Sequence, residues 1–107
     1  MTIEDRLNRE PEAWKPQPGD RLIGTVVEVE EYRSDYGTYP MITISTDDGQ
    51  EWMFHAFHTV ARTEIERKQP KPGDRIGIAY HGLSEKGYEQ YRIVLERQNG
   101  VAVATRV

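Results

Sequence analysis

The sequence predicts a mainly β domain in which five strands coil into a small barrel, with one helix between the third and fourth strands. Three observations support this fold class: apolar and polar residues alternate in five segments, turn-forming residues separate those segments, and a single segment has helical spacing. The chain has 107 residues and a mass of 12.4 kDa, which is the size of one domain. A five-stranded sheet this small has to coil if each strand is to bury an apolar stripe.

The strands are recognised from their two-residue periodicity and from the turns between them. Turns are indicated by Asp-Asp-Gly at 47–49 and by the tetrapeptide Pro-Gly-Asp-Arg, which occurs at 18–21 and again at 72–75. Gly24, inside the first strand, indicates a bulge or a bend. The segment 32–39 is interpreted as a polar, aromatic loop. The predicted strands are 21–31, 40–46, 50–56, 75–82 and 88–97.

A single convincing helix is predicted over residues 57–67. Its apolar residues recur at helical spacing, and charged residues occupy the remaining positions. We expect the apolar face of this helix to plug one end of the barrel. The residues of that face are Phe57, Val60, Ala61 and Ile65.

Two short segments flank the predicted barrel, which spans residues 14–97. Residues 1–13 are predicted to form an arm with a weak helix. The tail, residues 98–107, contains the hairpin signal Asn99-Gly100, so we expect it to fold back as a sixth strand. An exposed edge strand near residues 97–105 would suit pairing between copies of the chain in a homo-oligomer.

Composition excludes several classes of protein. No run of about 18 apolar residues occurs, so the chain is not expected to enter a membrane. The absence of cysteine excludes disulfides, thiolate metal sites and cysteine nucleophiles. The polar start of the chain has no signal peptide, so a cytoplasmic location is expected. The net charge of −4 argues against a surface coated in positive charge, but it allows a local basic or aromatic groove.

Five parts of the chain carry a resemblance to a known family. They are Gly19-Asp20 with Gly24-Thr25-Val26-Val27, Tyr36-Gly37-Thr38-Tyr39-Pro40, Phe57-His58-Thr59-Val60, the segment from Gly73 to Gly82, and Tyr88-Glu89-Gln90-Tyr91-Arg92. In these parts and in the order of its elements, the chain resembles OB-fold single-stranded-DNA-binding-like proteins of bacterial or phage type. The resemblance implies a Greek-key barrel that binds oligonucleotides across its second and third strands, between the loops after the first and fourth strands.

Residues at this position of the predicted barrel suit single-stranded nucleic acid, with DNA expected rather than RNA. Aromatic rings stack on bases at about 1–3 kcal/mol per base, and arginine and lysine contact phosphates. A loop gains no stability by exposing tyrosines, so those of segment 32–39 either pack on the barrel rim or contact a partner in a shallow groove. The candidate binding residues are Arg33, Tyr36, Tyr39, Thr43, His55, Lys86, Tyr88 and Arg92.

The register of the third strand decides which of its faces is available to a ligand. Trp52 and Phe54 share one phase, and Met53 and His55 share the other. We expect Trp52 and Phe54 in the core. A shift of one residue would exchange the faces and make these two rings the stacking platform.

Neither an enzyme nor a bound cofactor or metal is predicted. The three histidines lack further ligands at suitable spacing, and the glycines do not form a phosphate-binding loop before a helix. The alternative function is a protein-interaction or structural OB module that binds no nucleic acid. An oligosaccharide-binding module is a third interpretation, because aromatic platforms also stack on sugars.

Overall fold

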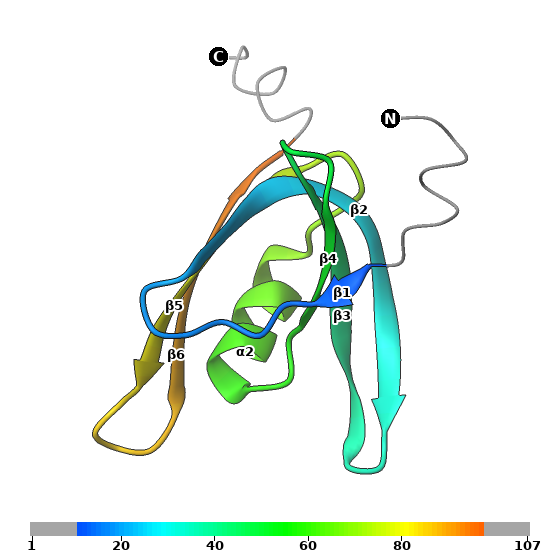
Figure 1. The fold of residues 1–107 in the computed structure, drawn as a ribbon. Coiled ribbons are helices and arrows are strands. Elements are labelled where there is room, and N and C mark those ends of the chain that lie inside the picture. Colours follow the sequence, from blue (N-terminus) through cyan, green and yellow to red (C-terminus); the bar gives the residue numbers. More distant parts are fainter. Residues whose placement is uncertain (1–10, 98–107) are drawn as a thin grey trace, which may run out of the picture.

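The computed structural model describes residues 11–97, which form a six-stranded sheet and one helix (Figure 1). The strand order is β1-β4-β3-β2-β5-β6, and every neighbouring pair except β1–β4 is antiparallel. Helix α2 (Thr59–Lys68) connects β4 to β5, so the predicted mainly β class and the position of its helix are confirmed. The strands are β1 (Glu12–Ala13), β2 (Arg21–Ser34), β3 (Gly37–Thr46), β4 (Glu51–His55), β5 (Arg75–Leu83) and β6 (Glu89–Glu96).

The long strand β2 belongs to both halves of the sheet. Its first residues pair with β5, and the rest of the strand pairs with β3. At Gly24 the backbone of β3 approaches closely: an added Cβ would lie 2.9 Å from Ile44 Cγ2 and closer still to the Ser45 carbonyl oxygen. The ladder shifts register between Val26 and Glu28, so the strand has a bulge as predicted, but the bulge lies just beyond Gly24. The bend lets one strand serve two arms of the sheet.

Replacing Gly24 by alanine is expected to destabilise the fold by about 1–3 kcal/mol, because the new methyl group would meet the β3 backbone. Gly77→Ala on β5 is a matched control. A Cβ there would meet Ile23 Cγ1 at 3.9 Å, an ordinary contact. Alanine is favoured over glycine in a strand by roughly 0.5–1 kcal/mol, so this variant should be neutral or more stable. Urea unfolding measures both, and equal stability of the two variants would contradict the constraint at Gly24.

The two copies of Pro-Gly-Asp-Arg form the same turn at the start of β2 and of β5. In each copy the aspartate carboxylate accepts a hydrogen bond from the backbone N–H three residues earlier. Asp20 accepts from Gln17 at 2.8 Å, and Asp74 accepts from Lys71 at 2.9 Å. The glycine of each copy has a φ of 96°, a conformation that favours glycine. The repeated tetrapeptide therefore starts two neighbouring antiparallel strands.

The core lies between the bent sheet and α2, which sits between the two arms of the sheet (Figure 1). Ala61 and Ile65 of the helix are buried there, as predicted. The prediction for Phe57 is wrong: the chain has to turn after β4, the helix begins only at Thr59, and 49% of the Phe57 surface is exposed. The buried residues of the sheet include Leu22, Val26, Ile42, Ile44, Phe54, Ile76, Ile78 and Ile93.

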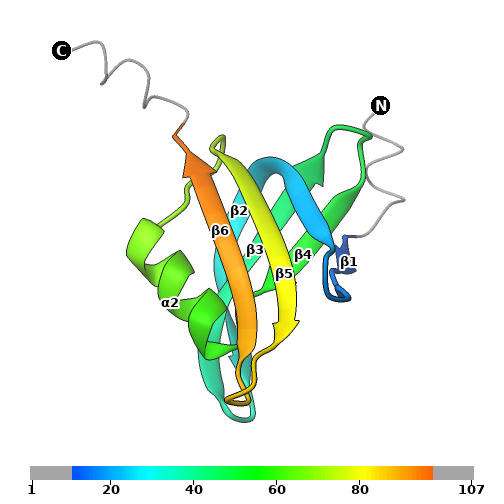
Figure 2. The same cartoon turned by 90° about the vertical axis from the view of Figure 1, so that its left-hand side faces the viewer.

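The sheet does not close into the predicted barrel. Within residues 11–97, β6 pairs only with β5 and forms one edge of the sheet, beside α2 (Figure 2). Aromatic rings occupy the opening between β4 and β6, which we call the seam: the ring centroids of Phe54 and Tyr91 lie 5.6 Å apart, and Trp14 lies 6.0 Å from Phe54. Paired strands need a separation of about 4.8 Å, so rings of this size between two edges prevent a backbone ladder.

The ends of the chain differ from the prediction where they are described. Glu12 and Ala13, predicted to be part of the arm, form β1 and pair in parallel with β4. The predicted arm helix, within residues 1–10, and the sixth strand of the tail, residues 98–107, lie outside the described part of the chain. In residues 11–97 no helix has the length and apolar character needed to cross a membrane.

Candidate nucleic-acid interface

The β2–β3 hairpin presents Tyr36 at its tip. The segment predicted as a loop is mostly strand, because β2 continues to Ser34 and β3 begins at Gly37. The Ser34 hydroxyl closes the turn by donating to the Gly37 carbonyl at 2.8 Å and accepting from the Tyr36 N–H at 3.2 Å. The Tyr36 side chain is 89% exposed, and Arg33 is exposed next to the tip. Both predicted contacts are therefore accessible.

The β5–β6 hairpin lies at the same end of the molecule as the β2–β3 hairpin, with the start of α2 between them (Figure 1). The Ser84 hydroxyl oxygen accepts hydrogen bonds from the N–H groups of Lys86 and Tyr88, both at 3.2 Å. Gly87 completes the turn with a φ of 90°. Lys86 and Tyr88 are exposed, so the second pair of predicted contacts faces solvent as well.

A series of aromatic side chains starts on the outer face of β2, β3 and β4. Tyr32 and Tyr39 are paired across β2 and β3 with ring centroids 5.3 Å apart, and His55 on β4 also lies 5.3 Å from Tyr32. The Tyr39 hydroxyl is hydrogen-bonded to His55 Nδ1 at 3.0 Å, and Tyr39 is only 9% exposed. Tyr39 therefore supports its neighbours and offers no free ring face, whereas 44% of the Tyr32 surface is exposed.

The series continues through the turn before α2 to the other arm of the sheet. Phe57 lies 5.4 Å from Tyr39 and 5.6 Å from His58, and His58 is stacked on Tyr91 at 6.1 Å. Tyr80 lies 4.9 Å from Tyr91. We call these seven side chains the aromatic row: Tyr32, Tyr39, His55, Phe57, His58, Tyr91 and Tyr80.

A pocket of about 350 Å³ opens at the seam, next to the second half of the aromatic row. Trp14 and Phe54 add their rings to it, and Lys15 and Glu89 are its charged groups. The Tyr80 hydroxyl donates to the Glu89 carboxylate, and this hydrogen bond raises the pKa of Tyr80 to about 12. A pocket of this volume, with ring walls and few polar groups, can accept a planar ring such as a nucleobase.

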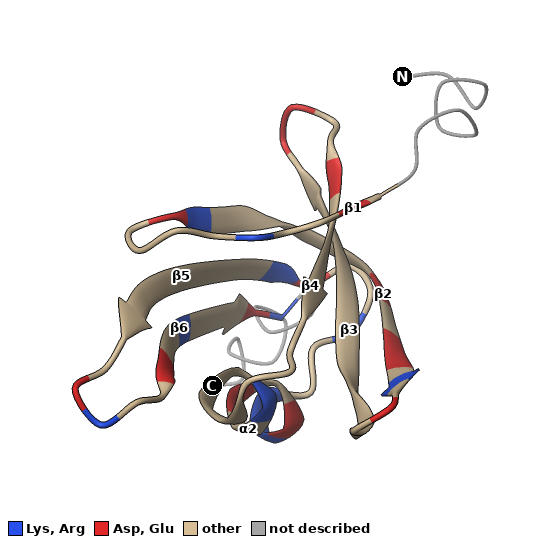
Figure 3. Ribbon diagram, turned by 60° about the horizontal axis from the view of Figure 1, so that its bottom comes forward, with Lys and Arg blue, Asp and Glu red and all other residues tan. Residues whose placement is uncertain are grey.

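Charges around the aromatic row balance one another. Figure 3 shows both signs along the two hairpins. At the hairpin tips and in the seam pocket, three cations face three carboxylates, so the surroundings carry no net charge. The cations are Lys15, Arg33 and Lys86, and the carboxylates are Asp35, Glu85 and Glu89.

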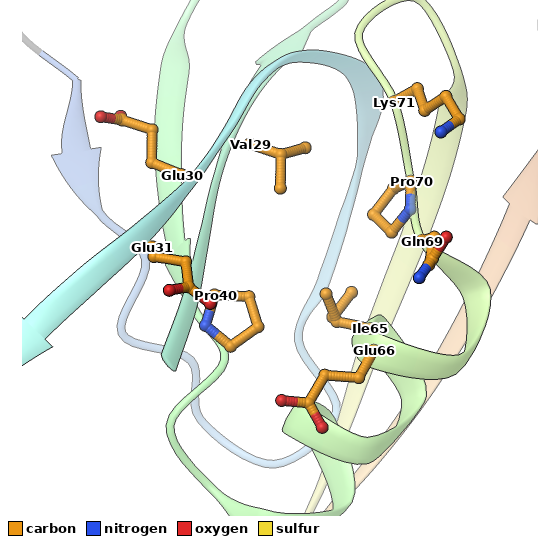
Figure 4. A pocket seen from close by; sticks show the side chains of 9 residues that line it. All are labelled: Val29, Glu30, Glu31, Pro40, Ile65, Glu66, Gln69, Pro70 and Lys71. Atoms are coloured by element: carbon orange, nitrogen blue, oxygen red, sulfur yellow. The ribbon is translucent and has the colours of Figure 1, made fainter. Parts of the chain in front are cut away.

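A second pocket, of about 400 Å³, lies between β2 and α2 (Figure 4). Apolar side chains point into it, and carboxylates surround it with one lysine among them. An excess of negative charge repels phosphates, so this pocket does not extend the candidate interface. Its lining includes Val29, Pro40, Ile65 and Pro70 as apolar residues, and Glu30, Glu31, Glu66 and Lys71 as charged residues.

Two predicted contact residues lie away from the aromatic row. Arg92 follows Tyr91 directly on β6, so it leaves the strand on the opposite face of the sheet, where it lines a separate pocket and also borders a groove beside the edge of β6. Thr43 is buried, with 6% of its surface exposed, and cannot reach a ligand there. The preferred register of the third predicted strand is confirmed, because Phe54 lies in the core and Trp52 packs against it.

Sequence reasoning missed most of the second half of the row. A residue whose side chain points to the inner face of a sheet is buried only where that face is covered. Here the seam leaves part of the inner face open to solvent. One signal was available: aromatic residues gather around the segment 83–87, which the sequence identifies as a loop. The missed side chains of the row are Phe57, His58, Tyr80 and Tyr91, and Trp14 of the adjoining seam pocket was missed as well.

Comparison with known proteins adds no identification: no family model, curated protein or solved structure matches this chain. Among residues 11–97, no three histidine, aspartate or glutamate side chains are grouped as a metal site requires. The groups that the row and the seam pocket present are ring faces, hydroxyls and single charges. These groups suit the binding of flat molecules with some charge.

Burial lowers the pKa of His55 below its usual 6.5, so the folded protein holds this imidazole neutral where the unfolded chain would protonate it. Stability should therefore fall as the pH drops from about 7 through 6.5 and below, because the unfolded state takes up the proton first. Urea unfolding at several pH values measures this dependence.

His55→Gln is the control for the pH effect. It should flatten the dependence near pH 6 but keep the loss of stability at lower pH, where Glu64 titrates. The hydrogen bond from Arg67 holds the pKa of Glu64 below 4.5. An unchanged pH profile in His55→Gln would show that another group is responsible.

Proposed function

We propose that this protein binds single-stranded nucleic acid, with bases stacked along the aromatic row between the two hairpins. One observation carries the proposal: seven aromatic or imidazole rings form an unbroken series of contacts from one hairpin to the other. Stacking does not require a particular base, because every base has a π-face. The protein would therefore bind with little sequence preference.

The proposal includes the fold family. An OB-fold is a partly open, five-stranded Greek-key barrel that binds oligonucleotides across its second and third strands. Strands β2 to β6 have the number, order and intervening helix that this family would require, and an unclosed seam is compatible with a partly open barrel. The two hairpins then correspond to the loops that flank the ligand in that family.

Five rings of the site are available for stacking. Tyr36 and Tyr88 stand at the hairpin tips, and Tyr32, Phe57 and His58 are exposed along the row. Each stacked base contributes about 1–3 kcal/mol. Because burial raises the pKa of Tyr39 and of Tyr91, the supporting rings stay neutral and add no repulsion toward phosphates.

Phosphate contacts would contribute less than stacking. Three cations surround the row, and carboxylates offset their long-range field. On single strands each phosphate contact adds about −0.7 to the slope of log affinity against log salt, so a total of roughly −2 is expected. Raising the salt fourfold should then weaken binding by roughly tenfold to twentyfold.

The test is the binding of labelled oligo-dT and oligo-rU, followed by fluorescence anisotropy. Phe57→Ala and Tyr36→Ala should each weaken binding by about 5- to 150-fold, the equivalent of one lost stack. Tyr36→Ala should leave thermal stability unchanged, because the Tyr36 side chain is 89% exposed. Val94→Ala is the matched control: its side chain is 51% exposed, similar to the 49% of Phe57, but lies on β6 away from the row. Its affinity should equal that of the unmodified chain.

Two results would reject the proposal. One is the absence of binding at protein concentrations of about 100 μM, the weak limit of non-specific nucleic-acid affinity. The other is an equal loss of affinity in Val94→Ala and Phe57→Ala. Arg33→Ala should reduce the salt slope by about 0.7, and an unchanged slope would remove Arg33 from the interface.

A role in protein interaction is the second candidate function. Ile23 and Val94 are 52% and 51% exposed, and with Gly77 between them they form a flat apolar strip on the outer face of β2, β5 and β6. Such a strip is typical of a contact with another protein. It lies on the face opposite the core, so both functions are compatible in one molecule.

A further inference from the structure

Strand β6 ends the sheet on one side and leaves an edge that is open to pairing. Within residues 11–97, β6 pairs with β5 alone. An edge strand presents backbone N–H and C=O groups that can pair with another chain. The hydrogen bonds on the side of β5 that faces away from β6 identify the residues of β6 that present these groups.

The peptide groups of Tyr80 on β5 point away from β6. The Tyr80 N–H donates to the Asp20 carbonyl at 3.0 Å, and the Tyr80 carbonyl accepts from the Gly19 N–H at 2.8 Å. In an antiparallel strand the direction of these groups alternates from one residue to the next. The neighbouring residue Ala79, and Gly77 two positions earlier, therefore direct their peptide groups to β6.

The partners of Ala79 and Gly77 on β6 are Arg92 and Val94. The peptide groups of these two residues form hydrogen bonds with β5. Because the direction alternates along the strand, the peptide groups of Tyr91, Ile93 and Leu95 point outward. No backbone hydrogen bond to the outward groups occurs within residues 11–97. The open edge therefore offers three N–H and three C=O groups over about 13 Å, at roughly 3.3 Å per residue.

A groove of about 580 Å³ lies between this edge and α2, and it is positively charged. The five residues 91–95 form one wall, and the end of the helix forms the other. Arg67 and Lys68 share one carboxylate, Glu64, at 3.0 and 3.7 Å, and Arg92 has no ion-pair partner within residues 11–97. The lysine, arginine and glutamate side chains of the groove thus add up to a net charge of +2, although the whole chain has −4.

We infer that the edge of β6 binds an extended acidic peptide segment of another protein, which adds to the sheet as a further strand. The backbone edge supplies hydrogen bonds that suit a peptide, and the basic side chains select glutamate or aspartate. A nucleic acid lacks the alternating donors and acceptors that the edge would pair with. A second copy of β6 is disfavoured, because two such grooves would place positive charges opposite each other.

Amide hydrogen exchange of the intact chain, followed by NMR, tests the inference. The probe is a capped five-residue peptide of alternating glutamate and valine, and the control peptide has lysine in place of glutamate. In the free protein the amides of Tyr91, Ile93 and Leu95 should exchange faster than those of Arg92 and Val94. The acidic peptide should slow the first three by about tenfold or more, and the lysine peptide should not.

Charge variants separate recognition from folding. Arg67→Glu and Arg92→Glu should each weaken the acidic peptide by about two- to fivefold, as expected for exposed ion pairs. Arg62→Glu is the control, because Arg62 lies on the same helix outside the groove and pairs with Glu66 at 3.1 Å. Phe57→Ala should not affect peptide binding, which distinguishes this site from the aromatic row.

Four results would overturn the inference. The first is protection of all three outward amides in the free chain, which would mean that another part of the chain already covers the edge. The second is equal binding of the lysine peptide. The third is protection that appears in the aromatic row and not along β6. The fourth is slowing of the same three amides by oligo-dT but not by the acidic peptide.

Discussion

The two arms of the sheet and the meeting of its hairpins both follow from the close approach of β2 and β3 at Gly24. Because no side chain separates the two backbones there, β2 can bend and pair with β5 at one end and β3 at the other. The bend turns the sheet into two arms that face each other across α2 (Figure 1). It also brings the β2–β3 and β5–β6 hairpins to one end of the molecule, and the candidate interface exists only because they meet there.

The aromatic rings of the seam combine two physical roles. Phe54 and Tyr91 fill the opening that a closed barrel would bridge with backbone hydrogen bonds, so they stabilise the contact between the arms. The same opening leaves neighbouring rings such as Phe57 partly in contact with water. Exposed rings cost hydrophobic free energy that a bound base could recover by stacking. The rings around the seam therefore stabilise the fold and also form the proposed binding surface.

Positive and negative residues are interspersed along the sequence, but in the folded protein they are grouped in different places. Positive charge gathers in the groove beside β6, negative charge surrounds the pocket between β2 and α2, and the aromatic row is close to neutral. This distribution cannot be inferred from the net charge of the chain, which is −4. The row would bind mainly by stacking, whereas the β6 edge would bind by backbone pairing with charge selection. The two proposed sites thus use different interactions and respond differently to salt.

The local structure could be predicted from the order of the residues. Alternation located five strands to within a few residues, the repeated Pro-Gly-Asp-Arg located two turns, and the phase of Trp52 and Phe54 identified their core face. These properties depend on neighbours in the chain. Whether the sheet closes could not be predicted in this way, because closure depends on how large rings from distant segments fit between β4 and β6. The candidate site likewise depends on contacts between distant segments. It therefore includes Phe57 and His58, which were not predicted, and leaves out Arg92, which was predicted but lies on the face opposite Tyr91.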